Sequence, residues 1–184
     1  MKTVIIDTET TGLVVEGAPL TEQPRVIELA ALVLTDSAAP KEFSQLYNPL
    51  EPLPEEIQKI TGLSDDVLRG APSWSMKEVL RVEELLAGAD WIVAHNAPFD
   101  ITMLGFEFQR VGRRWLGRQT LCTAAAAKEQ FGVRPRLAQL YKNLTGDGAP
   151  RKAHRAMDDV WTLFEALKAW PEVRDLVLAG VRYE

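Results

Sequence analysis

The stretch "VIIDTET", residues 4–10, sets the start of the fold and the position of its chemistry. Its aliphatic start is typical of a buried β-strand. Side chains alternate between faces in an extended chain, so Asp7 and Glu9 point to one side and Thr8 to the other. Two carboxylates on one face repel each other unless water surrounds them, one is protonated, or a cation lies between them; hard oxygen ligands at this spacing suit Mg²⁺ or Mn²⁺. The stretch alone leaves these alternatives open.

The length and composition are those of one domain that carries no membrane segment. The chain has 184 residues without a break in composition, enough to bury a substantial core. No apolar run reaches the roughly 18 residues that span a bilayer, and the start does not resemble a signal peptide, so we expect a cytoplasmic protein with no membrane partner. One cysteine and two histidines exclude an internal disulfide and a cysteine zinc site. Carboxylates must therefore be the main ligands of any metal.

The net charge of −5 conceals a basic segment in the second half of the chain. Residues 110–155 contain eleven basic side chains and two acidic ones, a local balance of +9. Such a run is often only a set of solvated helix faces. An acidic first half that holds metal ions and a basic second half would nevertheless suit a phosphodiester substrate. The basic residues are Arg110, Arg113, Arg114, Arg118, Lys128, Arg134, Arg136, Lys142, Arg151, Lys152 and Arg155.

Outward from the opening stretch, apolar runs and turn residues predict the other elements. We expect strands at residues 3–7, 25–35, 42–49 and 91–95. We expect two short helices within residues 54–72, the second capped by Ser64, and longer helices at 74–88, 122–131, 136–144 and 154–170. A strand meander followed by helix, strand and helices indicates an α/β domain with a mixed central β-sheet flanked by α-helices.

A further acid is predicted at the start of the helix that follows "WIVAH". Asn96 can cap this helix, and Pro98 fits its first turn. Asp100 then lies in the same turn, where the helix dipole favours its charge and where it stays near the end of the preceding strand. The favourable dipole is also a sufficient structural reason for an acid at this position.

The last predicted helix, "HRAMDDVWTLFEALKAW", contains two adjacent aspartates, of which one can face inward. Asp159 lies on the apolar stripe, four residues before Leu163, whereas Asp158 does not. A carboxylate on a core-facing stripe is costly unless it is paired or bound to metal. Asp158 can be an ordinary surface acid, paired with Arg155, and Asp159 could be satisfied by an arginine or the backbone. The joint occurrence of Asp7, Glu9, Asp100 and Asp159 favours two-metal phosphodiester hydrolysis.

Three motifs resemble those of the DnaQ-like, DEDDh-type 3′–5′ exonucleases, the family that includes the proofreading epsilon subunit of bacterial DNA polymerase III. They are "DTETTG" at 7–12, "AHNAPFD" at 94–100 and "HRAMDD" at 154–159, in the family's order. The resemblance covers roughly residues 2–170, and we treat residues 1–184 as a single domain of this type. It implies the ribonuclease H-like fold, in agreement with the predicted order of elements.

The resemblance also implies roles for individual residues. Asp7, Glu9, Asp100 and Asp159 would hold two Mg²⁺ or Mn²⁺ ions, and His154 would be the general base. An imidazole has an intrinsic pKa close to neutral pH, which suits this task. Thr8, Thr10, Gly12, Leu13 and Phe99 fall where they could contact the terminal nucleotide, although turn or core packing would explain them equally well.

Helix geometry adds one constraint on His154. It precedes Asp159 by five residues, about 140° round a continuous helix, so the two cannot share a face if both are helical. His154 must therefore lie in the loop or the first turn, where it could move onto bound substrate. His95, by contrast, is interpreted as structural, with its ring bonded to backbone. Trp115 could stack on a base or cover the helix behind it.

The sequence thus favours a metal-dependent 3′–5′ exonuclease that releases nucleoside 5′-monophosphates from single-stranded or frayed DNA. An exoribonuclease or oligoribonuclease on the same fold is the nearest alternative, because few contacts distinguish the sugar. A catalytically silent nucleic-acid-binding module would lack one of the acids or the histidine, and a purely structural metal site would need neither His154 nor a basic segment. A polymerase or repair partner is compatible with the sequence and not determined by it.

Overall fold

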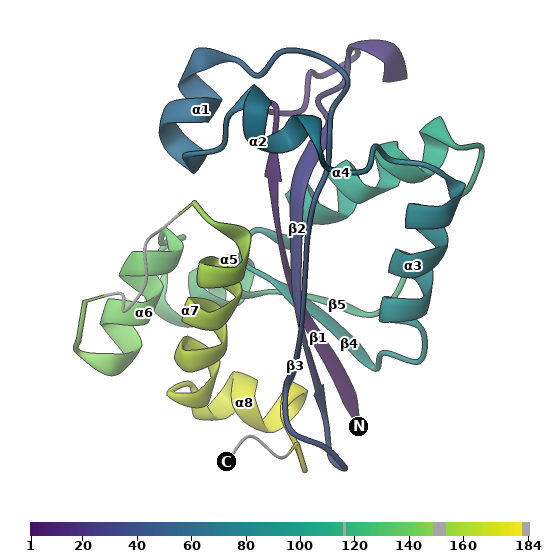
Figure 1. Cartoon of the computed structure of the whole chain (residues 1–184). Coiled ribbons are helices and arrows are strands. Elements are labelled where there is room, and N and C mark those ends of the chain that lie inside the picture. The colour runs from purple at the N-terminus through teal and green to yellow at the C-terminus, as the bar shows by residue number, and fades with distance from the viewer. Residues whose placement is uncertain (116, 149–153, 182–184) are drawn as a thin grey trace.

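A mixed five-stranded sheet forms the centre of the protein, which a computed structural model describes for residues 1–115, 117–148 and 154–181 (Figure 1). The strands lie in the order β3-β2-β1-β4-β5. The antiparallel pairs are β1–β2 and β2–β3, and the parallel pairs are β1–β4 and β4–β5. The predicted mixed sheet is therefore confirmed. Its strands are β1 (Lys2–Thr10), β2 (Val26–Thr35), β3 (Lys41–Leu46), β4 (Trp91–Ala94) and β5 (Thr120–Cys122).

Helices cover both faces of this sheet. In Figure 1, α7 and α8 lie on one side of the strands and α3 and α4 on the other. Among the described residues no helix is both long and apolar enough to cross a bilayer. The helices are α1 (Glu55–Thr61), α2 (Asp65–Arg69), α3 (Met76–Leu86), α4 (Ala97–Arg110), α5 (Thr123–Phe131), α6 (Leu137–Thr145), α7 (Ala156–Lys168) and α8 (Pro171–Val177), with a 3₁₀ turn at Leu20–Glu22.

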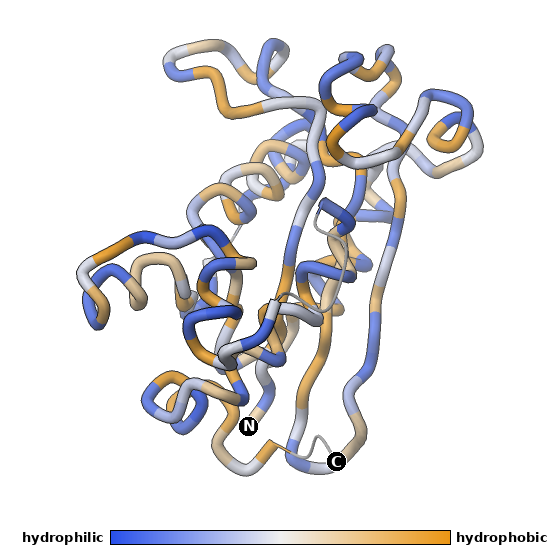
Figure 2. Tube along the Cα trace, turned by 90° about the vertical axis from the view of Figure 1, so that its left-hand side faces the viewer, coloured by the Kyte–Doolittle hydropathy of each residue, from blue (hydrophilic) through white to orange (hydrophobic). Residues whose placement is uncertain are grey.

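The alternation of β1 divides the core into two clusters. Ile5 packs with α7 and α8, whereas Val4 and Ile6 pack with α3 and α4. Each helix has an apolar stripe at the helical period, and Figure 2 shows hydrophobic and hydrophilic residues alternating along the helices. A third, smaller cluster joins the start of β2 to α1 and α2. Each helix thus buries one stripe against a defined face of the sheet.

Several boundaries differ from the predicted ones. The strand expected at 42–49 ends at Leu46: the Tyr47 N–H still bonds to the carbonyl of Ile27 on β2, but the Asn48 N–H bonds to the carbonyl of Pro72, so the chain leaves the ladder there. The helix expected to reach residue 170 ends at Lys168, and Pro171 opens α8, since proline fits only the first turn of a helix. Neither α8 nor the three-residue strand β5 was predicted.

The two predicted helix caps have different outcomes. The Ser64 hydroxyl accepts a hydrogen bond from the N–H of Val67, so the cap of α2 is confirmed. Asn96 does precede α4, but its side chain makes no cap bond and its backbone is left-handed, with φ of 73°. Its side-chain oxygen instead accepts a hydrogen bond from Arg134.

Candidate metal and catalytic site

The carboxyl half of β1 carries the first two predicted site residues. Asp7 and Glu9 share the face of Ile5, which is covered by α7, and Thr8 faces α4. β1 extends further than predicted, to Thr10, so both acids lie within the strand. The β1–β2 register is interrupted between Glu9 and Thr10, at the end of the carboxylate pair. Such an irregularity is of the kind that re-aims side chains next to active sites.

Asp100 reaches the same region from the other face of the sheet. It lies in the first turn of α4 and is 2% exposed. Its Oδ1 accepts hydrogen bonds from the Thr8 N–H (3.0 Å) and the Thr8 hydroxyl (2.8 Å). β4 ends at Ala94, which leaves the Thr8 N–H without a strand partner on that side. Asp100 therefore takes the place of a β4 residue beside β1.

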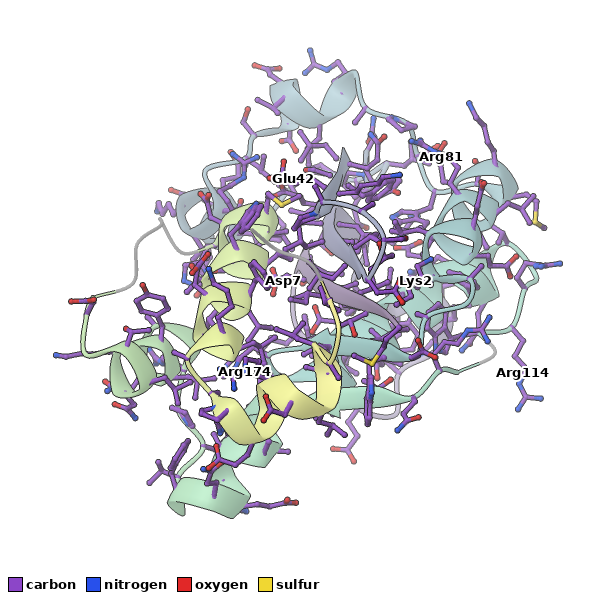
Figure 3. The ribbon with its side chains drawn as sticks, turned by 90° about the horizontal axis from the view of Figure 1, so that it is seen from below. Lys2, Asp7, Glu42, Arg81, Arg114 and Arg174 are labelled. Atoms are coloured by element: carbon purple, nitrogen blue, oxygen red, sulfur yellow. The ribbon has the colours of Figure 1, made fainter. Side chains whose placement is uncertain are left out.

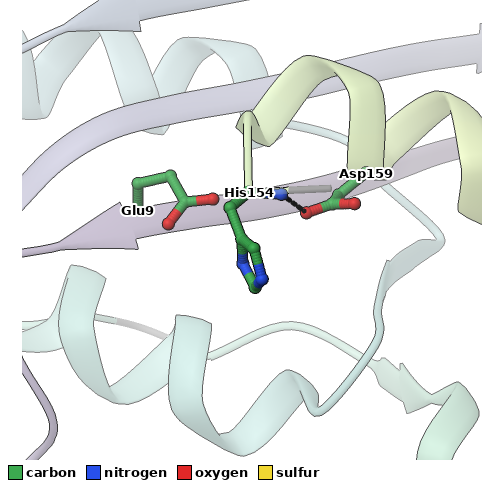
Figure 4. Close-up of side chains that lie close together, drawn as sticks. All are labelled: Glu9, His154 and Asp159. Atoms are coloured by element: carbon green, nitrogen blue, oxygen red, sulfur yellow. Dashed lines mark hydrogen bonds between the residues drawn. The ribbon is translucent and has the colours of Figure 1, made fainter. Parts of the chain in front are cut away.

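The start of α7 brings His154 and Asp159 to Glu9. His154 lies before the helix, as predicted, with a left-handed φ of 65°, and its N–H donates to Asp159 Oδ2 at 3.0 Å. One side-chain donor atom from each of Glu9, His154 and Asp159 lies within 4.8 Å of the others (Figure 4). The movement predicted for the preceding segment concerns mainly residues 149–153, which lie outside the described residues.

A buried ion pair beside these residues was missed by the sequence interpretation. Glu28 pairs with Glu9 across the β1–β2 register and is 1% exposed. Arg155 donates to both carboxylate oxygens of Glu28, each at 3.1 Å. The ion pair of Arg155 is thus with Glu28 and not with Asp158, because Glu28 is buried and offers a bidentate acceptor, although the charge of Asp158 also raises the pKa of Arg155. An acid inside the apolar run "VIELAALVL" was the available signal.

The four carboxylates Asp7, Glu9, Asp100 and Asp159, here called the acid cluster, strongly perturb one another. Burial, followed by the charges of Asp100, Asp159 and Glu9, raises the pKa of Asp7 well above its usual range. Burial and the charge of Asp159 raise the pKa of Glu9 to about 8, and burial raises the pKa of Asp100 to about 7. Burial also raises the pKa of Asp159. The cluster therefore binds either protons or cations at neutral pH.

The donor set of the acid cluster fits hard divalent cations. All four side chains offer carboxylate oxygens, the ligand type that suits Mg²⁺ and Mn²⁺. Cys122, the single thiol in the chain, forms no part of the three-residue group around Glu9. Among the described residues, no lysine or arginine forms an ion pair with the acid cluster; the charge of Arg155 acts on Glu9, but its guanidinium is bonded to Glu28.

The loop after β1 is held firmly although its tip is exposed. Leu13, a predicted nucleotide contact, has 80% of its surface exposed, and the Thr10 hydroxyl donates to the carbonyl of Gly12 at 2.7 Å. Arg110 donates to three carbonyls of the same loop, those of Leu20, Gln23 and Pro24. Leu13 is thus free to touch a ligand on a fixed support.

The other predicted contacts are less accessible. Thr8 is bonded to Asp100, and Thr10 is 8% exposed. Phe99 is partly buried against the α3–α4 core cluster. Trp115 packs edge-on against Phe108, with ring centroids 5.1 Å apart, which favours its role as a cover over α4. Within the described part of the chain, Thr8 is the one of these positions with a hydrogen bond to the acid cluster.

The structural role predicted for His95 is confirmed. Nε2 lies 3.0 Å from the carbonyl oxygen of Pro135, and Nδ1 lies 3.1 Å from the Thr123 hydroxyl. Burial lowers the pKa of His95, and the nearby charge of Arg134 acts in the same direction. The ring is therefore neutral at physiological pH and links β4 to the segment between α5 and α6.

A mixed sheet with acids from β1, α4 and α7 meeting beside a histidine defines a nuclease of the ribonuclease H-like fold. The profile of the exonuclease family (RNase_T) matches residues 4–167, and the chain belongs to this family. It is DnaQ-like, since DNA polymerase III epsilon subunits are among its relatives, and exonucleases of this family use divalent metal ions.

Similar proteins come from several bacteria. A putative bifunctional exonuclease/endonuclease of Mycobacterium tuberculosis is 32% identical over 170 residues, which is 90% of this chain and 26% of that protein. The DNA polymerase III epsilon subunit of Rickettsia prowazekii is 30% identical over 174 residues, covering 92% of this chain and 73% of the subunit. A PolC-type DNA polymerase III of Halalkalibacterium halodurans is 36% identical, but the match spans 7% of its length. The chain thus spans 26% of the length of the first of these relatives and 7% of the last.

Two solved structures have a similar fold. Exonuclease X, in complex with 5′ overhanging duplex DNA, superposes with a TM-score of 0.64 at 25% identity, covering 95% of this chain and 92% of that one. The nuclease domain of 3′hExo, a DEDDh family member bound to rAMP, gives a TM-score of 0.71 over 100% of this chain and 96% of that one. At 18% identity, this second likeness concerns the fold alone.

Proposed function

We propose that the protein is a metal-dependent 3′–5′ exonuclease that releases nucleoside 5′-monophosphates from single-stranded or frayed 3′ ends of DNA. The observation that carries the proposal is the acid cluster, which has no ion pair with a described lysine or arginine and has His154 beside Glu9 and Asp159. Exonuclease X in complex with DNA and the polymerase III relatives support DNA as the substrate. We take residues 1–184 to act as one exonuclease domain.

Each residue then has a defined task. Asp7, Glu9, Asp100 and Asp159 would hold two divalent ions, Mg²⁺ or Mn²⁺. Bound ions of this kind make a nucleophile available near neutral pH and stabilise charge on the phosphodiester as it is cleaved. His154 accepts the proton of the attacking water, and its exposed position before α7 gives the ring access to that water. Asp159 orients this segment through its bond to the His154 N–H.

A terminal nucleotide would enter from the side of the loop after β1. Leu13 offers an exposed apolar surface to a base, and the anchored loop keeps that surface in place. The last phosphodiester would then lie at the divalent ions that the acid cluster would hold. The partner proposed on this basis is a single-stranded 3′ end. A polymerase partner and a cytoplasmic location stay predictions, to which the names of the epsilon and PolC relatives lend support.

The direct test uses 5′-labelled single-stranded DNA and RNA of one sequence, incubated with Mg²⁺, Mn²⁺ or EDTA. We expect a ladder that shortens from the 3′ end, needs metal and proceeds faster on DNA. Faster cleavage of RNA would support the exoribonuclease alternative. Shortening from the 5′ end, or cleavage in EDTA, would contradict the proposal.

Adjacent aspartates provide a matched control. Asp159→Asn should reduce the rate by roughly 10²-fold or more, the scale of removing one group that stabilises a transition state. Asp158→Asn, the same change one residue earlier on α7, should leave the rate within about twofold. His154→Gln should lower kcat by about 10²–10⁴-fold while metal-induced stabilisation is retained. A larger loss in Asp158→Asn than in Asp159→Asn would overturn the assignment.

A further inference from the structure

The basic segment is not explained by the acid cluster, and the structure sorts its members by their partners. Three of its arginines are neutralised by glutamates: Arg110 by Glu107, Arg113 by Glu83 and Arg155 by Glu28. Arg151 and Lys152 lie outside the described residues. Arg134 differs from the three paired arginines, because within the described part of the chain no carboxylate forms an ion pair with it.

Arg134 is nevertheless held in one orientation. Its Nη2 donates to the side-chain oxygen of Asn96 at 2.6 Å, and both residues are exposed. A guanidinium carries five N–H donors in a planar fork, so one bond to a neutral amide leaves the positive charge and most donors available. Such a group matches the oxygens of a phosphate.

The backbone that carries Arg134 is fixed by the neighbouring residue. The carbonyl of Pro135 can only accept, so the Nε2 of His95 carries the proton in their 3.0 Å contact. Nδ1 of the neutral ring then accepts from the Thr123 hydroxyl at 3.1 Å. Arg134 and Pro135 are thus bonded to consecutive residues, Asn96 and His95, at the junction of β4 and α4. Two adjacent tethers make the position of Arg134 a property of the fold.

This junction lies beside the acid cluster. Val93 of β4 pairs with Ile5 of β1, so the chain reaches Asn96 near the level at which β1 reaches Asp7 and Thr8. Asp100 follows four residues later and bonds to Thr8. Through its bond to Asn96, which follows β4, Arg134 is thereby tied to the β4 side of β1, whereas Glu28 lies on the β2 side.

We propose that Arg134, oriented by Asn96, binds a backbone phosphate of the substrate strand next to the phosphodiester held at the acid cluster. The proposal rests on the function proposed above. The acids repel a polyanion, so a fixed cation at their edge would guide the strand and reduce that repulsion. His95 acts as a positioning residue for this contact, since its ring fastens the segment that carries Arg134.

The test measures kcat and KM on 5′-labelled single-stranded DNA in Mg²⁺ over a series of KCl concentrations. For Arg134→Gln we expect KM to rise about tenfold, the scale of one charged hydrogen-bonding contact, with kcat within about twofold. The slope of log(kcat/KM) against log[KCl] should become shallower by about 0.7, one phosphate contact on a single strand. Arg134→Lys keeps the charge and should restore the slope, with KM between the two.

Arg114→Gln is the matched control, because it removes the same charge from an exposed residue at the periphery, far from Asp7 in Figure 3. It should leave both KM and the slope unchanged. Equal slopes for Arg134→Gln and the wild type, or equal changes in both glutamine variants, would overturn the proposal. If the wild type cleaves nothing, the proposed function fails and the proposal on Arg134 is tested by binding. Fluorescence anisotropy of the same strand then gives Kd, and the slopes of log Kd against log[KCl] are compared between the same variants.

Discussion

Asp100 and Glu107 lie on one helix, α4, and both are almost completely buried, at 2% and 0% exposed. Glu107 contacts two arginines, Arg25 at 3.0 Å and Arg110 at 3.1 Å. Asp100 accepts from the neutral donors of Thr8 and forms no ion pair with a described residue. The same helix therefore carries one acid whose charge the protein neutralises and one whose charge it leaves exposed to its neighbours.

The difference extends to the rest of the molecule. The buried glutamates Glu28, Glu78 and Glu107, here called the paired glutamates, each have an arginine partner. The acid cluster has none among the described residues, and the pKa of each of its members is raised. A buried charge without a partner is costly, so it is retained where a ligand supplies the missing cation. Pairing with arginine thus separates acids that hold the fold from acids available for chemistry.

The largest effect is expected from breaking a paired glutamate. Glu107→Gln keeps the size of the side chain but removes the carboxylate that pairs with both Arg25 and Arg110, which are only 17% and 15% exposed. The free energy of unfolding, measured by urea denaturation, should fall by about 3–5 kcal/mol, the usual cost of removing one partner of a buried pair. A loss below about 1 kcal/mol would show that the paired glutamates and the acid cluster do not differ as described.

The pH dependence of the stability should come from the acid cluster, whose pKa values are raised. A folded-state pKa above the unfolded value stabilises the fold below the unfolded pKa, about 4, and this stabilisation is lost as the pH rises through the folded value. With Glu9 near 8 and Asp100 near 7, stability in EDTA should decline from pH 5.5 to pH 8.5. Mg²⁺ at about 100 times its Kd should add about 2.7 kcal/mol at pH 8, and less at pH 5.5, where protons compete.

Thermal unfolding with and without Mg²⁺ at the two pH values provides the measurement. A Tm in EDTA that rises with pH, or an increase by Mg²⁺ that is the same at both values, would contradict the raised pKa values of the acid cluster. Ca²⁺ and Na⁺ serve as controls for the charge and for the ionic strength.

Removing one charge from the acid cluster should stabilise the metal-free fold. Asp7→Asn keeps the shape of the side chain and relieves its repulsion by Asp100, Asp159 and Glu9, so unfolding in EDTA at pH 8 should cost roughly 1 kcal/mol more than in the wild type. Nuclease activity should be lost in the same variant. Asp158→Asn is the control. A destabilised Asp7→Asn protein would contradict the prediction, because favourable contacts of Asp7 would then outweigh its repulsion by the other acids.

The parts of this site that the sequence predicted are those that local geometry determines. Alternation along a strand puts Asp7 and Glu9 on one face, and the angle per helical residue keeps His154 out of α7. The apolar stripe separates Asp159 from Asp158 for the same reason. These rules use only residues that are close together in the chain.

The parts that were missed depend on contacts between distant segments. Arg155 meets Glu28 across 127 positions, and Arg134 meets Asn96 across 38. Local patterns predicted that Arg155 pairs with Asp158 and that Asn96 caps α4. In the structure Arg155 pairs with Glu28 and the Asn96 side chain bonds to Arg134. The strand β5 has three residues, too few for a hydrophobic period, and forms because β4 offers it an edge.

The smallest effect is expected at the most exposed of the paired glutamates. Glu78 is buried, but 44% of the Arg81 side chain is exposed, so water can solvate the arginine when its partner is lost. Glu78→Gln should therefore cost about 1 kcal/mol or less, well below the loss in Glu107→Gln, when both are measured by urea denaturation. A loss as large as that of Glu107→Gln would mean that burial of the acid alone sets the cost. The smaller loss expected for Glu78→Gln than for Glu107→Gln would show that solvation of the arginine sets the cost. An unpaired buried charge is then costly only where water cannot replace its partner, and the acid cluster is in that position until a cation binds.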